Sequence, residues 1–169
     1  MTFSVYIKFN YIGHKVNIIF ITTSSIYIIF VFKLLITMRY IKNTNTDPYF
    51  NMAFDEYCLE KLNIDEPVFY LWQNRPAVIV GYNQDINTEV NLDYLKTNNI
   101  ALVRRVTGGG AVYHDLGNLN YTIVGRSDNL EESYPEYASL MMKALQRLGV
   151  PAILSGRNDI LVGERKVSG

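Results

Sequence analysis

Hydrophobic and polar positions form a regular pattern from residue 38 to the end of the chain. Asp47 and Pro48 suit the cap and first turn of a helix, and apolar side chains then recur at spacings of three and four residues. This apolar stripe consists of Phe50, Ala53, Phe54, Tyr57, Cys58 and Leu62. It predicts an amphipathic helix that begins at residue 48.

Short runs rich in β-branched and aromatic residues predict the strands. They lie at residues 38–42, 67–73, 76–82, 100–106, 111–114, 119–125, 152–154 and 159–162, and further helices are expected at 90–97 and 136–148. We expect 111–114 and 119–125 to form a hairpin around residues 116–118. Because consecutive strands are mixed with only a few helices, the pattern predicts an α/β chain of the α+β type, with a mixed, largely antiparallel sheet flanked by helices.

Residues 1–37 have a different character. Residues 16–32 carry no charge, and the apolar stretch continues after Lys33 to nearly the length that spans a bilayer. Three interpretations compete: a membrane anchor within residues 16–36, a buried β-rich segment, and translation of an upstream region with the natural start at Met38. We favour the third, because polarity changes at Met38 and a complete pattern begins there. The domain boundaries expected are therefore 1–37 and 38–169, which N-terminal sequencing of the native protein tests.

Charge and cysteine content narrow the function classes. The first 37 residues hold three lysines and no acidic residue, which leaves 13 basic against 16 acidic residues in the body, a net charge of −3. A mildly acidic body argues against general nucleic-acid binding, which needs a basic face. Cys58 is the only cysteine, so the sequence has no disulfide framework and a cytoplasmic location is expected. Its place on the apolar stripe favours a small buried side chain over a nucleophile.

The strongest chemical signal is RRVTGGGAVYHDLGNLNY, residues 104–121. Two arginines lead into a glycine run, and a predicted strand follows; the residues are Arg104, Arg105, Gly108, Gly109, Gly110, Ala111, Val112, Tyr113 and His114. The phosphate loop of nucleoside triphosphatases and the dinucleotide fingerprint both open a helix, so neither fits. Backbone amides of a glycine run can still form an anion-binding nest, and arginine suits phosphate or carboxylate. The segment therefore predicts an anion site.

His114 and Asp115 allow several roles. Asp115 could orient the imidazole or take part in general base catalysis, or His114 could form local hydrogen bonds that brace the loop. A metal site on His114 is disfavoured, because the only other histidine is His14.

A second polar cluster lies at residues 156–169. Two antiparallel strands there would bring Asp159 and Lys166 together, next to Asn158. Asp159 could hold Mg²⁺, which prefers oxygen ligands and substrate phosphates. Lys166 could neutralise charge on a phosphate or acyl oxygen, although an ordinary surface hairpin fits the spacing equally well.

RRVTGGGAVYHDLGNLNYT resembles the signature of lipoate–protein ligases, and TDPYFNMAFDEYCLE, FYLWQNRPAVIVGYNQD and GRNDILVGERKVSG match the same family in the same order. The resemblance covers residues 38–169. It implies a fold similar to biotin protein ligases and class II aminoacyl-tRNA synthetases. It also implies ATP-dependent activation of lipoate to lipoyl-AMP, followed by transfer of the lipoyl group to a lysine of an acceptor protein. The implied acceptors are the apo lipoyl domains of 2-oxoacid dehydrogenase acyltransferase subunits and the glycine cleavage H protein.

The resemblance also implies roles for single residues. Arg105 is similar to the family's ATP-binding arginine, and Arg104, the glycines and His114 belong to the same motif. Residues 110–113 resemble the run that holds the nucleotide and the activated acid. Lys166 resembles the essential lysine, which contacts both lipoate and the α-phosphate, and Asn158 and Asp159 match a polar pair near the phosphates. Trp72 is expected either to line the lipoate pocket or to pack in the core.

The chain departs from the family in one respect. It ends three residues after Lys166, where the family continues through the rest of the catalytic domain, so a fragment is expected. Two other functions compete with an active ligase: an octanoyltransferase of the same fold, which uses a cysteine thioester and no ATP, and a non-catalytic remnant that binds lipoate or nucleotide. A biotin ligase fits less well, because the order of its arginine–glycine loop differs.

Overall fold

The computed structural model describes residues 2–4, 7–9, 38–62, 66–126, 130–156 and 159–168. Its elements in chain order are β1 (Thr2–Ser4), β2 (Ile7–Phe9), β3 (Arg39–Tyr40), α2 (Pro48–Glu60), β4 (Val68–Trp72), β5 (Ala77–Val80), α3 (Ile86–Glu89), α4 (Leu92–Thr97), β6 (Ala101–Arg104), β7 (Val112–His114), β8 (Leu119–Arg126), α5 (Leu130–Arg147), β9 (Ala152–Ser155), β10 (Asp159–Val162) and β11 (Arg165–Ser168). The predicted strands and helices are therefore present, with bounds shifted by a few residues.

The strands form three sheets. The central sheet has the order β1-β8-β4-β3, and β2 also pairs with β8. A second sheet has the order β6-β5-β7 and a third β11-β10-β9. β3 runs parallel to β4, and β5 runs parallel to β6. The other pairs are antiparallel. The prediction of a mixed, largely antiparallel architecture with helices is confirmed.

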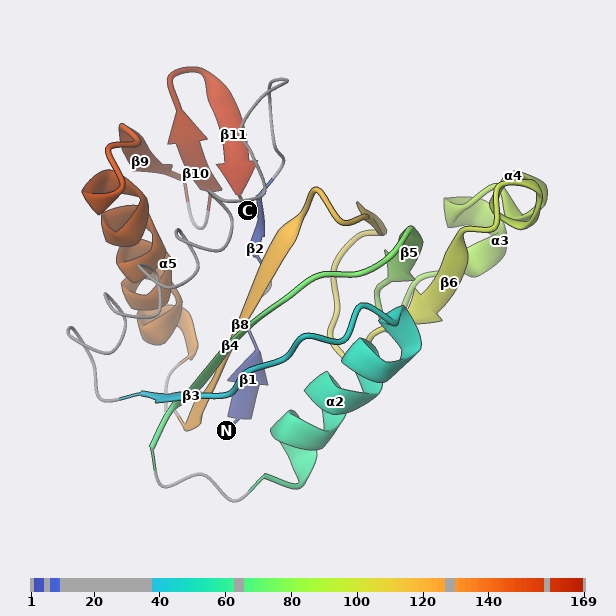
Figure 1. Ribbon diagram of the computed structural model, residues 1–169, viewed down its shortest axis with the longest axis horizontal. Coiled ribbons are helices and arrows are strands. Elements are labelled where there is room, and N and C mark those ends of the chain that lie inside the picture. The colour runs from blue at the N-terminus through green and yellow to red at the C-terminus, as the bar shows by residue number, and fades with distance from the viewer. Residues whose placement is uncertain are drawn as a thin grey trace.

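Strands β4 and β8 lie between helices α2 and α5, which cover opposite sides of the pair (Figure 1). Every residue of β4 is buried. Alternate side chains of β4 enter different clusters: Tyr70 joins Met52 and Cys58 of α2, whereas Phe69 joins Met141 of α5. A strand covered on both faces needs apolar residues at every position, which explains its unbroken apolar run.

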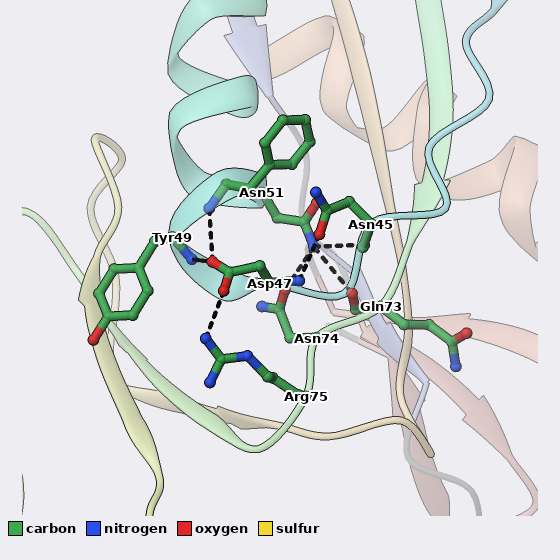
Figure 2. A network of polar contacts seen from close by, with 8 residues as sticks. Asn45, Asp47, Tyr49, Asn51, Gln73, Asn74 and Arg75 are labelled. Carbon is green, nitrogen blue, oxygen red and sulfur yellow. Dashed lines mark hydrogen bonds and ion pairs between the residues drawn. The ribbon is translucent and has the colours of Figure 1, made fainter.

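Helix α2 begins where the sequence predicts. The Asp47 side chain accepts hydrogen bonds from the backbone N–H groups of Tyr49 and Phe50, at 2.9 and 3.1 Å. Arg75 forms an ion pair with the same carboxylate (Figure 2). That hydrogen-bonded pairing lowers the pKa of Asp47 from its usual value. Asp47 therefore caps the helix and attaches it to the segment between β4 and β5.

The face that α2 buries differs from the predicted stripe. The buried residues are Pro48, Asn51, Met52, Asp55 and Cys58. Phe50 and Tyr57 of the predicted stripe are 47% and 53% exposed. The sheet side of α2 accommodates polar residues because they find partners there: Asp55 accepts hydrogen bonds from the hydroxyl groups of Tyr70 and Thr122.

The predicted hairpin of residues 111–114 and 119–125 is wrong. β7 pairs with β5 in the second sheet, and β8 pairs with β4 in the central sheet. The turn between them does form, with the backbone N–H of Asn118 donating to the Asp115 carbonyl at 3.1 Å. It carries the chain from one sheet to another.

The predicted helix at 90–97 is present as α4, and α3 precedes it. The two helices are separate because Asn91 caps α4: its side chain accepts from the backbone N–H of Tyr94 at 2.9 Å.

Two short pieces of the N-terminal segment contact the body of the chain. β1 pairs antiparallel with residues 124–126 of β8, and β2 pairs with residues 119–121. Residues 16–36, the stretch considered as a membrane anchor, lie outside the described residues. Within the described ranges, no helix has both the length and the apolar character that a bilayer span requires.

Candidate active site

The glycine run between β6 and β7 is braced by the side chain of Arg105. Its guanidinium donates to the Gly108 carbonyl through Nε and Nη2, at 3.1 and 2.8 Å, and to the Gly110 carbonyl through Nη2 at 2.8 Å. Nη1 donates to the Ile79 carbonyl of β5 at 3.2 Å. Arg105 is only 8% exposed, and this desolvation lowers its pKa. Arg105 therefore fixes the shape of the loop by joining its carbonyls to β5.

Gly81 makes the loop's close approach to β5 possible. A Cβ at Gly81 would lie 2.0 Å from the carbonyl oxygen of Gly109. Gly109 itself has φ of +98°, a conformation that favours glycine. The backbone N–H of Tyr82 also donates to the Thr107 carbonyl at 2.9 Å. The loop therefore packs backbone against backbone on the end of β5.

Arg104 braces a different turn. Its Nη1 atom donates to the carbonyls of Gly81, Tyr82 and Gln84, at 2.7, 2.9 and 2.8 Å. The Gln84 side chain in turn accepts from the Gly81 N–H at 2.8 Å. The two arginines thus brace two adjoining loops, and their described hydrogen bonds go to backbone carbonyls of those loops and of β5.

A pocket of about 410 Å³ opens beside the residues that follow the glycines. Ala111, Val112 and Tyr113 form one side of it. Its other lining residues come from β5, α4 and the segments around α3 and α4: Val78, Glu89, Val90, Asn91, Tyr94, Leu95 and Ile100. Apolar walls with a few polar groups are typical of small-molecule sites, so the pocket joins the glycine run in one candidate site.

His114 ends β7 in a buried position. It is 3% exposed, its Nδ1 lies 3.1 Å from the Asn74 amide nitrogen, and its ring meets the Trp72 ring edge-on at 5.6 Å. Asp115 accepts from the Gly117 N–H through Oδ1 at 2.8 Å. These contacts agree with the bracing role for His114, and they place Asp115 in the turn.

Lys166 and Asp159 belong to the predicted second polar cluster, and the structure brings them together. Their ion pair joins β11 to β10, with Nζ 2.8 Å from Oδ1, as the predicted antiparallel strands require. Lys166 is 56% exposed at its side chain. Asn158 lies outside the described residues. The hairpin belongs to the third sheet, whereas the glycine run leads into β7 of the second sheet. Figure 1 shows β4 and β8 of the central sheet between these two sheets.

Trp72 and Cys58 both lie in the core, which is where the sequence predicted Cys58. Trp72 is 2% exposed, its Nε1–H donates to the Thr122 hydroxyl at 3.0 Å, and it does not line the pocket beside β7. Cys58 is 1% exposed, and burial raises its thiol pKa to about 11. Within the described ranges, no three His, Cys, Asp or Glu side chains gather into a metal-binding group.

Sequence reasoning missed several residues that shape this site. Gly81 lay within the predicted strand 76–82 and Gln84 just after it, and Asn51 and Asn74 gave no motif. Each acts through a partner more than 20 positions away, except Gln84, whose partner Gly81 is close by. The only available signal was the asparagine within the predicted helix, where asparagine has a poor intrinsic preference.

The chain is similar in sequence to proteins of one family. The family model described as "Lipoyl protein ligase A/B catalytic domain" matches residues 47–169. "Lipoate–protein ligase 1" of Staphylococcus aureus is 48% identical over 134 residues, which are 78% of this chain and 41% of the relative. A lipoate–protein ligase of Bacillus subtilis is 43% identical over 134 residues, 78% of this chain and 40% of its own length. The chain therefore spans about two fifths of the curated relatives it matches.

Solved structures agree. A lipoate–protein ligase A bound with ATP is 34% identical with a TM-score of 0.67, covering 76% of this chain and 57% of that one. LipL1 of P. falciparum in complex with lipoate is 31% identical with a TM-score of 0.62, over 76% and 42% of the two chains. A bipartite lipoate protein ligase of Thermoplasma acidophilum, described with its E2 lipoyl domain, is 32% identical with a TM-score of 0.68. The match covers 76% of this chain and 51% of that one. Fold, motif and sequence agree, and the chain belongs to the lipoyl protein ligase A/B catalytic domain family.

Proposed function

We propose that this chain is the nucleotide- and acyl-binding part of a lipoate–protein ligase. The reaction has two steps: lipoate's carboxylate attacks the α-phosphate of ATP to give lipoyl-AMP and pyrophosphate, and a lysine of the acceptor protein then displaces AMP to form an amide. The acceptors are apo lipoyl domains of 2-oxoacid dehydrogenases and the glycine cleavage H protein. One observation carries the proposal: Arg105 holds the glycine run, and the residues that directly follow it, Ala111, Val112 and Tyr113, line a pocket of about 410 Å³.

The site supports this chemistry through positioning and charge. Backbone amides along residues 108–111, ahead of the β7 ladder, suit phosphate oxygens, and the buried guanidinium holds this run by its Gly108 and Gly110 carbonyls. The pocket beside Val112 and Tyr113 offers room for the adenine ring or the acyl chain of the adenylate. Competition by AMP alone and by octanoate alone against a labelled adenylate analogue distinguishes the two occupants.

Lys166 is assigned the role of charged stabiliser. An ammonium beside the reacting phosphate and carboxylate offsets the negative charge that develops when the mixed anhydride forms. Asp159 holds Nζ through the ion pair, which restricts the long lysine side chain. Asp159 would also hold Mg²⁺ through its carboxylate, and the ion would supply positive charge that neutralises the phosphates. Arg105 acts on ATP through the loop shape that it fixes.

Lipoate-dependent ATP–pyrophosphate exchange tests the proposal. Lys166→Ala should lower the exchange rate by about 100-fold or more, the usual effect of losing one stabilising donor. Lys61→Ala is a matched control, because Lys61 is also exposed and also forms an ion pair, with Glu60 at 3.7 Å. Normal exchange by the Lys166 variant would contradict the role given to that lysine.

A second candidate function is binding of the adenylate without completion of the reaction. Binding of a lipoyl-AMP analogue with no exchange under any lipoate concentration would assign this role. The cytoplasmic location stays a prediction, tested by cell fractionation.

The octanoyltransferase alternative is disfavoured by Cys58. An acyl-thioester mechanism needs an accessible thiolate, whereas this thiol is 1% exposed with a pKa of about 11. Acyl transfer from an acyl carrier protein without ATP would reverse this conclusion.

A further inference from the structure

Three asparagine side chains form a directional hydrogen-bond chain that ends on His114. Asn43 donates to Oδ1 of Asn51 at 2.9 Å, Asn51 donates to Oδ1 of Asn74 at 2.7 Å, and the Nδ2 of Asn74 lies 3.1 Å from Nδ1 of His114. Figure 2 shows Asn51 of α2 directed at Asn74 of the segment after β4. The chain thus links the first turn of α2 to the end of β7.

Two backbone carbonyls fix the direction of the chain. The Asn51 amide nitrogen also donates to the carbonyl oxygens of Asn45 and Gln73, at 3.1 and 3.0 Å. A carbonyl oxygen only accepts, so this end of Asn51 is its NH₂ group, and the Asn74 atom that faces it at 2.7 Å is oxygen. The NH₂ group of Asn74 therefore faces His114.

We infer that this chain of asparagine hydrogen bonds holds His114 as a neutral imidazole with its proton on Nε2. A ring nitrogen that accepts from an amide carries no proton, and a neutral imidazole has one N–H, which is then on Nε2. Burial enforces the choice: Asn74, Asn51 and His114 are 0%, 2% and 3% exposed, and two donors facing each other there would both lose their partners.

The fixed imidazole anchors the far end of the candidate site. Arg105 holds the glycine run at Gly108 and Gly110, and His114 ends the same run where it pairs with Ala77 of β5. The segment between them includes Ala111, Val112 and Tyr113, which line the pocket. His114 is therefore a positioning residue for the run. Its value for catalysis rests on the proposed function, whereas the tautomer does not.

The tautomer is measured directly by NMR on the ¹⁵N-labelled full chain. The sequence contains only two histidines, so His14→Gln assigns the remaining imidazole signals to His114. Long-range ¹H–¹⁵N correlations should show an unprotonated Nδ1 and a protonated Nε2. A protonated Nδ1, or signals averaged between tautomers, would overturn the inference without any variant of the asparagines.

Asn74→Asp tests the chain and the positioning role together. A carboxylate accepts where the amide donated, so His114 should carry a proton on Nδ1, and the backbone amide signals of residues 110–113 should move. Asn98→Asp is the matched control: Asn98 is exposed and its amide donates to the Tyr94 carbonyl at 2.9 Å, so neither set of signals should change. A tautomer change that leaves the signals of residues 110–113 in place would refute the positioning role.

Discussion

Gly81→Ala is the sharpest test of the packing of the glycine loop. The added Cβ would lie 2.0 Å from the Gly109 oxygen, 3.0 Å from its carbonyl carbon and 3.3 Å from the Arg105 guanidinium. The first distance is about 1.4 Å short of ordinary van der Waals contact, which begins near 3.4 Å. The obstacle is backbone, and Arg105 binds the carbonyls on both sides of Gly109. The loop must therefore move away from β5.

The cost follows from two opposing effects. Overpacking of this kind destabilises by about 1–3 kcal/mol. Replacing glycine by alanine also restricts the unfolded chain, which stabilises by about 0.4–1 kcal/mol. We expect a net loss of about 1–2 kcal/mol in the free energy of unfolding, together with weaker binding of ATP or an adenylate analogue, because the displaced loop carries the proposed phosphate-binding amides.

Urea unfolding followed by tryptophan fluorescence measures the effect. Trp72 is the only tryptophan and is 2% exposed, so it reports the loss of the core. Gly110→Ala is the control for stability, because a Cβ there meets nothing within 4 Å and the residue has no positive φ. Equal midpoints for the Gly81 and Gly110 variants would refute the steric reasoning.

Three further predictions concern the scaffold. Cys58 should resist a thiol reagent at pH 8 until the chain is unfolded, and fast labelling of the native protein would contradict this. Because folding raises the pKa of this thiol from 9.0 to about 11, its stabilising contribution should be present below pH 9 and lost as pH rises through 11. Asp47→Ala should lower the urea unfolding midpoint, and Asp47→Asn should lower it less, since asparagine still caps the helix. Equal losses would show that the ion pair with Arg75 matters more than the cap. A chain that starts at Met38 lacks β1 and β2, so the edge of β8 with which they pair would be left unpaired. This variant should aggregate more readily than the full chain, as measured by light scattering, and identical scattering would show that the edge needs no cover.

Local features of the sequence were sufficient for the elements and the family. Asp47 and Pro48 begin α2 as predicted, because capping depends on residues within a few positions. The proximity of Lys166 and Asp159 also followed from the sequence, since a short turn between two strands leaves little choice of partner. The glycine run and its flanking arginines were recognisable for the same reason: the chemistry lies in one contiguous stretch.

Only the tertiary structure decided which strands pair and what each side chain does. β7 joins β5 and not its neighbour β8, and an alternating apolar pattern is the same in either sheet. Arg104 and Arg105 read as ligand-facing donors but bind carbonyls of the 81–84 turn, the glycine run and β5. Contacts such as Gly81 with Gly109 and Asn74 with His114 join residues 28 and 40 positions apart, so they exist only once the sheets have brought distant backbones together.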